Sequence, residues 1–204
     1  MKIAVLAGGL SPERDVSLTS GSLIATSLSR SGHAVALVDL YLGVKELPSN
    51  LEDVFVKGRS YSYKVETAEP DLEALVESNG GRRAPIGEGV LDICRAADVV
   101  FLALHGSIGE NGQLQATLDN YGIKYTGSGY VGSLLAMDKD IAKKLLQDAG
   151  ISTPPSVKFD CHSSPESIAA AVESIGYPCV VKPCSAGSSV GVQIVADREQ
   201  FIAA

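Results

Sequence analysis

The sequence predicts an α/β fold, in which a parallel-sheet domain at residues 1–138 precedes the start of an α+β domain at residues 139–204. Two observations support this prediction. Short apolar segments alternate with helical patterns through most of the chain, which is typical of a parallel sheet. A connector of Ile, Ser, Thr and Pro at residues 151–155 then leads into a second group of elements.

The start of the chain predicts a strand–helix–strand unit. An apolar run at residues 3–7 predicts the first strand, and residues 34–39 predict the second. Between them we expect a helix over about 17–31, which Gly32 is suited to end.

Residues 43–90 are less regular, and we assign no chemistry to them. They mix Gly, Pro, Asn and charged residues, with a possible hairpin at 60–65 and a short helix at about 71–78. We expect 79–88 to be an exposed loop, whose two arginines are typical of a solvated turn.

A strand at 98–103, a helix near 113–120 and a short segment at 124–126 complete the first domain. The domain change falls near residue 138, and a helix at 139–148 follows it.

The second domain should contain a helix capped by Ser164 and a buried strand at 178–181. A further strand at 192–195 precedes a helix capped by Asp197. Because this helix reaches Ala204 in less than three turns, we expect the chain to stop inside a domain.

Composition excludes several classes of partner. A net charge of −7 and a pI near 4.9 argue against nucleic acid and acidic membranes, whose phosphates would be repelled. No apolar run approaches the ~20 residues of a membrane span, and only five apolar residues precede Gly8, too few for a signal peptide. We therefore expect a cytoplasmic protein.

The four cysteines contain no Cys-x-x-Cys pair, which argues against structural zinc. Cys179 and Cys184 are close in sequence, and we interpret them as small packing residues rather than a redox pair.

The segment 182–191 is the most informative in the chain. Lys182 ends the predicted strand at 178–181 and enters a loop of small residues. Gly187 allows the backbone N–H groups to turn toward an anion, and the hydroxyls of Ser188 and Ser189 add donors. This pattern indicates ATP, although the lysine precedes the glycines, unlike in a P-loop. A plain flexible loop is the alternative.

Two further glycine-rich loops follow predicted strands. His105 and Glu110 lie in the loop after the strand at 98–103, and Glu13 lies after the strand at 3–7. Ligands bind at the carboxyl ends of parallel strands, so both loops are candidate substrate sites.

Together these loops resemble the D-alanine–D-alanine ligase family of ATP-grasp enzymes, and the match spans nearly the whole chain. The resemblance rests on Gly-Gly-x-Ser-x-Glu-Arg-[Asp/Glu]-Val-Ser at 8–17, Leu-His-Gly-x-x-Gly-Glu-[Asn/Asp]-Gly at 104–112, Tyr-Thr-Gly-Ser-Gly at 125–129, Met-Asp-Lys at 137–139 and Lys-Pro-x-x-x-Gly-Ser-Ser-x-Gly at 182–191. It implies a Rossmann-like pre-ATP-grasp domain, followed by the first part of an ATP-grasp domain that is truncated at its C-terminus.

For the nucleotide, the resemblance implies that Lys139 and Lys182 hold the ATP phosphates. Gly187, Ser188 and Ser189 would belong to a lid over the γ-phosphate, with Ser188 also orienting the substrate in a catalytic role. In isolation, Lys139 would be interpreted as a solvated lysine at a helix start.

For the amino acid, the resemblance implies that Glu13 is catalytic and anchors the ammonium of the first D-alanine. His105 and Glu110 would bind substrate in the same region. The alternatives are a helix-dipole role for Glu13 and an exposed loop acid for Glu110. His33 and His162 are expected to be inert.

The implied reaction joins two D-alanines at the expense of ATP, through an acyl phosphate, to supply peptidoglycan precursor. The Mg²⁺ ligands, a transition-state arginine and the residues that grip adenine are expected beyond Ala204, with no metal ligand within this chain. We therefore expect the chain alone to be inactive and the full-length form to be a homodimer. Alternatives are a ligase using D-lactate or D-serine, or a non-catalytic nucleotide or amino-acid binding module. A dinucleotide oxidoreductase is disfavoured, because Gly-x-Gly-x-x-Gly is absent.

Overall fold

The computed structural model divides into two compact units, Met1–Ser133 (unit 1) and Leu134–Ala204 (unit 2), each of which is described by itself. The structure describes residues 1–65, 69–160, 162–187 and 191–204. No described helix is long and apolar enough to cross a membrane.

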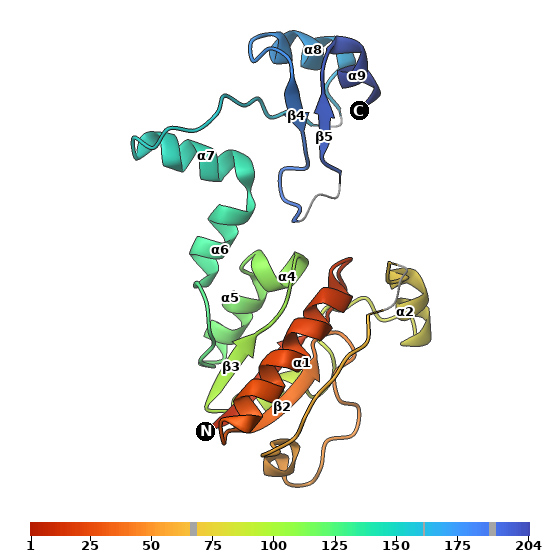
Figure 1. The fold of residues 1–204 in the computed structure, drawn as a ribbon, viewed down its shortest axis with the longest axis vertical. Helices are drawn as coiled ribbons and strands as arrows, with labels where there is room; N and C mark the ends of the chain where they lie inside the picture. Colours follow the sequence, from red (N-terminus) through yellow and green to blue (C-terminus); the bar gives the residue numbers. More distant parts are fainter. Residues whose placement is uncertain (66–68, 161, 188–190) are drawn as a thin grey trace. The chain divides into compact units, whose positions relative to one another are not determined.

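Unit 1 is built on a three-stranded parallel sheet, which confirms the predicted α/β class (Figure 1). The strands β1 (Lys2–Ala7), β2 (Ala34–Asp39) and β3 (Val99–Leu102) lie in the order β2-β1-β3. Ile3 pairs with a residue of β2 on one side and of β3 on the other. The central strand β1 is buried beyond its first residue, as expected for a strand covered on both faces.

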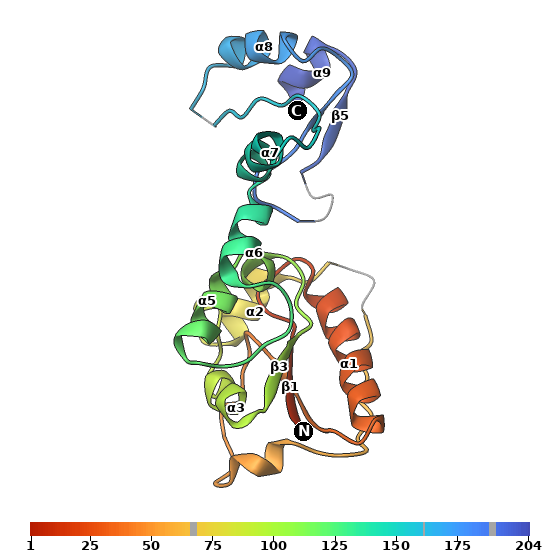
Figure 2. The same cartoon turned by 90° about the vertical axis from the view of Figure 1, so that its left-hand side faces the viewer.

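Helices cover both faces of this sheet, with α1 (Arg14–Arg30) on one side and α3 (Val90–Ala96) and α5 (Gln113–Asn120) on the other (Figure 2). The side chains of β1 alternate between the two faces. Odd-numbered Ile3, Val5 and Ala7 pack with α1, and even-numbered Ala4 and Leu6 pack with α3 and α5.

The helix α1 begins three residues before its expected start. A turn precedes it, in which Arg14 N donates to Ser11 O at 3.0 Å. The helix packs close to β1, because a Cβ on Gly21 would lie 2.5 Å from the Cβ of Ala7. Gly32 follows the helix with φ +88°, as its expected role at the helix end requires.

The hairpin predicted at 60–65 is wrong. Residues 55–61, which we call the strap, follow the 3₁₀ helix η1 (Leu51–Val54). Val56 exchanges two backbone hydrogen bonds with Val35 of β2, at 3.0 and 3.1 Å. Further along, Tyr61 N donates at 2.8 Å to the hydroxyl of Thr26 on α1, and Tyr61 O accepts from the same hydroxyl at 3.0 Å. The alternating segment thus pairs with a helix instead of a second strand.

The next part of unit 1 contains α2 (Leu72–Ser78), which confirms the short helix expected there, and the expected loop at 79–88. Arg82 in this loop is not simply solvated. Its guanidinium lies 4.7 Å from the ring centroid of the fully buried Tyr41 and donates to Ile86 O at 3.1 Å. The helix α3, which follows Gly89, was not expected.

After β3, the short helix α4 (Ser107–Glu110) lies where we expected only a loop, and α5 matches the expected helix. The segment at 124–126 runs parallel to β3, with Val100 N donating to Lys124 O at 2.8 Å and Thr126 N donating to Val100 O at 3.0 Å. The unpredicted helix α6 (Tyr130–Met137) spans the division between the units.

Unit 2 contains α7 (Lys139–Asp148), α8 (Pro165–Glu173), β4 (Cys179–Val181), β5 (Gln193–Val195) and α9 (Arg198–Ala203). The two caps predicted here are confirmed, because the side chain of Ser164 accepts from Ser167 N and that of Asp197 accepts from Gln200 N. The two strands pair antiparallel, and Ala169, Val172, Val195 and Phe201 form a small core.

The strand β4 is not buried as predicted. Cys179 and Val181 pack toward the core of unit 2, but Val180 is 52% exposed. Ile194, directly opposite Val180 in the register, is 78% exposed. The sheet therefore buries one face, and its other face carries apolar side chains without cover from the described residues.

Candidate functional site

The first candidate site is formed by the loops that follow β1 and β3 in unit 1. These loops meet because the two strands are parallel neighbours. The fully buried Ser17 of α1 joins their bases, since its hydroxyl accepts from Gly8 N at 2.8 Å and donates to Ala103 O at 2.7 Å.

A second serine joins the loops further from the sheet. The hydroxyl of Ser11 accepts from Glu13 N at 3.2 Å and donates to His105 O at 3.1 Å. Ser11 is only 3% exposed. The structure therefore brings the predicted residues Glu13 and His105 into one place.

The carboxylate of Glu13 lies against Gly106. An alanine Cβ at this position would lie 2.5 Å from Glu13 Oε2 and 3.1 Å from Ser11 Oγ. Gly106 also has φ +65°, a conformation that side-chain-bearing residues rarely adopt. Glycine here thus allows the two loops to approach.

Glu13 is the N-cap residue of α1, but its side chain makes no capping hydrogen bond. In the described part of the chain its half-buried carboxylate has neither a hydrogen bond nor an ion pair. Its place at the N-cap is compatible with the helix-dipole alternative, and the carboxylate keeps free acceptor capacity.

The neighbouring Arg14 does not neutralise Glu13. It forms a buried ion pair with Asp39 instead and donates to Gly9 O at 2.9 Å. Asp39 Oδ1 in turn accepts from the backbone N–H groups of Tyr41 and Leu42 at 2.9 and 3.0 Å. This network fixes the loop that carries Glu13 to the carboxyl end of β2.

The loop that contains His105 is held by contacts to the helices α5 and α1. The buried Gln115 of α5 donates to Gly109 O at 2.7 Å, and the half-buried His105 places Nε2 3.4 Å from Ser20 Oγ. Glu110 is exposed at the end of α4, and no hydrogen bond or ion pair among the described residues joins it to Glu13 or His105.

The second candidate site is a pocket of about 440 Å³ in unit 2. Four lysines contribute to its lining, together with apolar side chains from 155–159 and β4. The lining residues include Lys139, Lys143, Lys158, Lys182, Val157 and Phe159. A site of this composition suits an anion attached to an apolar group.

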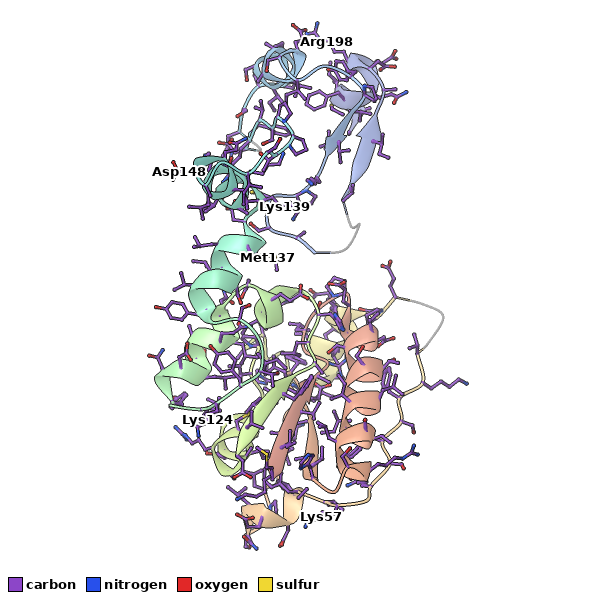
Figure 3. All side chains as sticks on the ribbon, turned by 60° about the vertical axis from the view of Figure 1, so that its left-hand side comes forward. Lys57, Lys124, Met137, Lys139, Asp148 and Arg198 are labelled. Carbon is purple, nitrogen blue, oxygen red and sulfur yellow. The ribbon has the colours of Figure 1, made fainter. Side chains whose placement is uncertain are left out.

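Lys139, labelled in Figure 3, ties the start of α7 to the loop after β4. Its Nζ donates to Ala186 O at 2.6 Å and to Cys184 O at 3.3 Å, and its backbone N donates to Cys184 O at 3.0 Å. The Cys184 thiol donates to Asp138 Oδ1 at 3.1 Å. A backbone hydrogen bond from Ile141, and then this thiol, lower the pKa of Asp138.

Lys182 is exposed and has no hydrogen bond or ion pair among the residues that the structure describes. Two other lysines of the pocket have partners: Lys143 Nζ donates to Pro154 O at 2.9 Å, and Lys158 Nζ lies 3.9 Å from Asp140 Oδ2. Of the predicted loop residues, Gly187 is described and half-buried. Ser188 and Ser189 lie outside the described residues.

The described residues contain no group of three His, Cys, Asp or Glu side chains that could hold a metal ion. Within the part of the chain that the structure describes, the carboxylates, histidines and cysteines thus form no cluster that fits a magnesium site.

Ser11 and Arg14 lie within the motif at 8–17, but the motif alone predicts no role for either residue. A local signal for Ser11 exists, since a serine two residues before Glu13 can accept from its N–H in a turn. The contact to His105 O depends on the fold and has no such signal.

The fold and the two candidate sites define an α/β protein with polar loops at its strand ends, followed by a unit with a lysine-lined pocket. Two family models match the chain, the D-ala D-ala ligase N-terminus over residues 2–128 and the D-ala D-ala ligase C-terminus over residues 145–204. The chain therefore belongs to the D-alanine–D-alanine ligase family, and the resemblance drawn from its motifs is confirmed.

Individual relatives agree with this assignment. The chain is 45% identical to the D-alanine–D-alanine ligase of Pediococcus pentosaceus, over 98% of this chain and 57% of that protein. It is 40% identical to that of Lacticaseibacillus casei, over 98% of this chain and 56% of the relative. The chain thus spans little more than half the length of these curated relatives.

Solved structures show the same fold. A D-alanine–D-alanine ligase from Bacillus anthracis has a TM-score of 0.68 at 28% identity, covering 100% of this chain and 52% of the other. A structure of the Bacillus anthracis ligase complexed with ATP has a TM-score of 0.59 at 29% identity, covering 100% of this chain and 53% of the other.

Proposed function

We propose that this chain forms the N-terminal portion of a ligase that joins two D-alanines at the expense of ATP. The observation that carries the proposal is that Lys139 and Lys182, from two separate motifs, line one pocket. The family relationship and the ATP complex of a structural relative support the same function.

Unit 1 would bind the amino acid. The carboxylate of Glu13 would accept hydrogen bonds from the ammonium of the first D-alanine, a charge-assisted contact that suits a zwitterion. His105 would bind and orient the substrate from the adjoining loop, and Glu110 would contribute from its rim. The network around Arg14 and Asp39 supports this role, because it leaves the charge of Glu13 uncompensated.

Unit 2 would bind the nucleotide. Lys139 and Lys182 would hold phosphate oxygens, and Val157 and Phe159 add apolar surface to the same pocket. Gly187, Ser188 and Ser189 would close over the γ-phosphate, and Ser188 would also orient the substrate. Closure would exclude water from the acyl phosphate.

The proposed chemistry transfers the γ-phosphoryl group of ATP to a carboxylate oxygen of the first D-alanine, which yields ADP and an acyl phosphate. The amine of the second D-alanine attacks the acyl carbon, loses a proton and displaces phosphate. Phosphoryl transfer depends mainly on positioning and charge neutralisation, which the two lysines would supply in part. Magnesium would supply further neutralisation from ligands outside this chain.

We further propose that the complete protein is a cytoplasmic homodimer that supplies peptidoglycan precursor. We also propose that the 204-residue chain alone has no ligase turnover, since its described residues contain no cluster suited to the magnesium ion that the family relationship implies.

Two substitutions in the ligase that contains this segment test the proposal. Lys182→Ala removes a charge-assisted contact of about 1.5–3 kcal/mol, so it should weaken ATP binding roughly ten- to hundredfold. Glu13→Gln keeps the shape but removes the anion, so it should raise the Michaelis constant for the first D-alanine. Lys124→Ala, at an exposed lysine of unit 1, provides the matched charge control.

Steady-state kinetics with each substrate varied is the measurement. ATP affinity should be unchanged in Glu13→Gln, and D-alanine affinity at saturating ATP should be unchanged in Lys182→Ala. The opposite pattern would show that the two loops have been assigned to the wrong substrates.

A further inference from the structure

We propose that Ser11 is a positioning residue, whose buried hydroxyl holds the loop of Glu13 against the loop of His105. The inference rests on the proposed function, because it assigns to Ser11 the placement of the group that would anchor the D-alanine ammonium.

The hydroxyl of Ser11 serves both loops at once. It accepts from Glu13 N at 3.2 Å and donates to His105 O at 3.1 Å. A serine hydroxyl has one proton to donate, and Ser11 gives it to the other loop. At 3% exposure, water cannot readily replace either contact.

Among the described residues, no backbone hydrogen bond joins the two loops at the level of Ser11. Near the sheet, Ala103 N donates to Leu6 O at 2.9 Å, so the bases of the two loops are held by the strand ladder as well as by Ser17. Further out, Ser11 makes the one hydrogen bond between residues 9–13 and 104–106 that the described part of the chain contains. The register of the outer loops therefore depends on Ser11.

The hydrogen bond between Ser11 and His105 O affects the position of the Glu13 carboxylate. Glu13 Oε2 lies 2.5 Å from where a Cβ of Gly106 would be, so the position of the carboxylate depends on how closely the two loops approach. Without the hydroxyl, the loops can separate and the carboxylate loses its fixed position. Ser11 itself has no proposed contact with substrate, and its effect should pass through Glu13.

The test compares Ser11→Ala with Ser29→Ala in the complete ligase. Ser29 is a matched control, because it is 2% exposed and its hydroxyl also bridges two backbone groups of unit 1, accepting from Arg59 N at 2.9 Å and donating to Val56 O at 3.5 Å. Both variants should lose similar stability. Only Ser11→Ala should raise the Michaelis constant for the first D-alanine, by about five- to tenfold, with that for ATP unchanged.

A readout independent of catalysis is amide hydrogen exchange. Ser11→Ala should accelerate exchange in both 10–16 and 104–109, although only the first segment carries the substitution. Faster exchange in 10–16 alone would refute the proposal that the Ser11 hydroxyl holds the two loops together. If Ser11→Ala does not fold, Ser11→Cys keeps the size and a weak donor, and it should show the same pattern to a smaller degree.

The double variant Ser11→Ala/Glu13→Gln separates the two proposals. If Ser11 acts through Glu13, its effect on the D-alanine constant should disappear when Glu13 is already changed. Additive effects would refute the positioning role while leaving the proposed function intact. If Glu13→Gln alone has no effect on D-alanine, the proposed function of the site itself fails.

Discussion

Replacing Gly106 with alanine tests how closely the two loops of unit 1 must approach. The substitution has two separable effects. The first is backbone strain at φ +65°, which costs about 1–2 kcal/mol for a residue with a Cβ. The second is steric, because the new Cβ would lie 2.5 Å from Glu13 Oε2.

The steric effect should appear in binding more than in stability. The carboxylate ends a flexible side chain, so it can move away by about 1 Å to reach an ordinary contact distance. The energetic cost of that movement is small, but it takes Glu13 out of its position. Loss of a charge-assisted contact with the ammonium should raise the Michaelis constant for the first D-alanine by roughly tenfold or more.

Gly122→Ala is the control, because Gly122 has the same φ of +65° and no atom within 4 Å of an added Cβ. Thermal unfolding and D-alanine kinetics would be measured for both variants of the complete ligase. We expect similar losses of stability and a change in the D-alanine constant for Gly106→Ala only. Equal D-alanine constants in the two variants would refute the assignment of Glu13 to the substrate.

Three further predictions concern stability. Burial raises the pKa of Cys94 from 9.0 to about 12, so the free energy of unfolding should fall by ~1.4 kcal/mol per pH unit as the pH rises from 9 toward 12. In urea titrations Cys94→Ala should remove this dependence on pH, and an unchanged dependence would contradict the burial argument. Gly21→Ala should destabilise unit 1 by about 1–3 kcal/mol in thermal unfolding, because the new Cβ would lie 2.5 Å from the Cβ of Ala7. This cost should exceed the gain from the better helix propensity of alanine. A gain in stability would show that α1 can move away from β1. Hydrogen exchange at Val180 should be much faster than at Val100 of β3, since β4 has one open face; equal protection would mean that unit 2 is as stable as unit 1.

The elements that could be predicted from the sequence are those with local signals. The strands of unit 1 carry uninterrupted apolar runs. The N-cap residues Ser164 and Asp197 predict the helices that follow them. By contrast, α3 begins after Gly89, which has no side chain to cap the helix, and so it was missed. The buried appearance of 178–181 was misleading because a two-stranded sheet covers only one face.

Contacts between distant segments explain the remaining differences. The alternation at 60–65 looks like a strand, but Tyr61 pairs with the hydroxyl of Thr26, which a helix presents. In the candidate site, glycine loops after strands predict that Glu13 and His105 meet. That Ser11 links them depends on a residue 94 positions away, which no local pattern encodes.

The strap covers one edge of the sheet in unit 1, and covered edges limit association with other chains. An uncovered strand at the edge of a sheet offers free N–H and C=O groups to other chains. In unit 1, Val56 of the strap occupies the outer side of β2, and the segment at 124–126 occupies that of β3. The sheet of unit 2 has no third strand among the described residues, and it exposes Val180 and Ile194. Aggregation of this chain should therefore begin at β4 and β5, and a charged residue at Ile194 should suppress it.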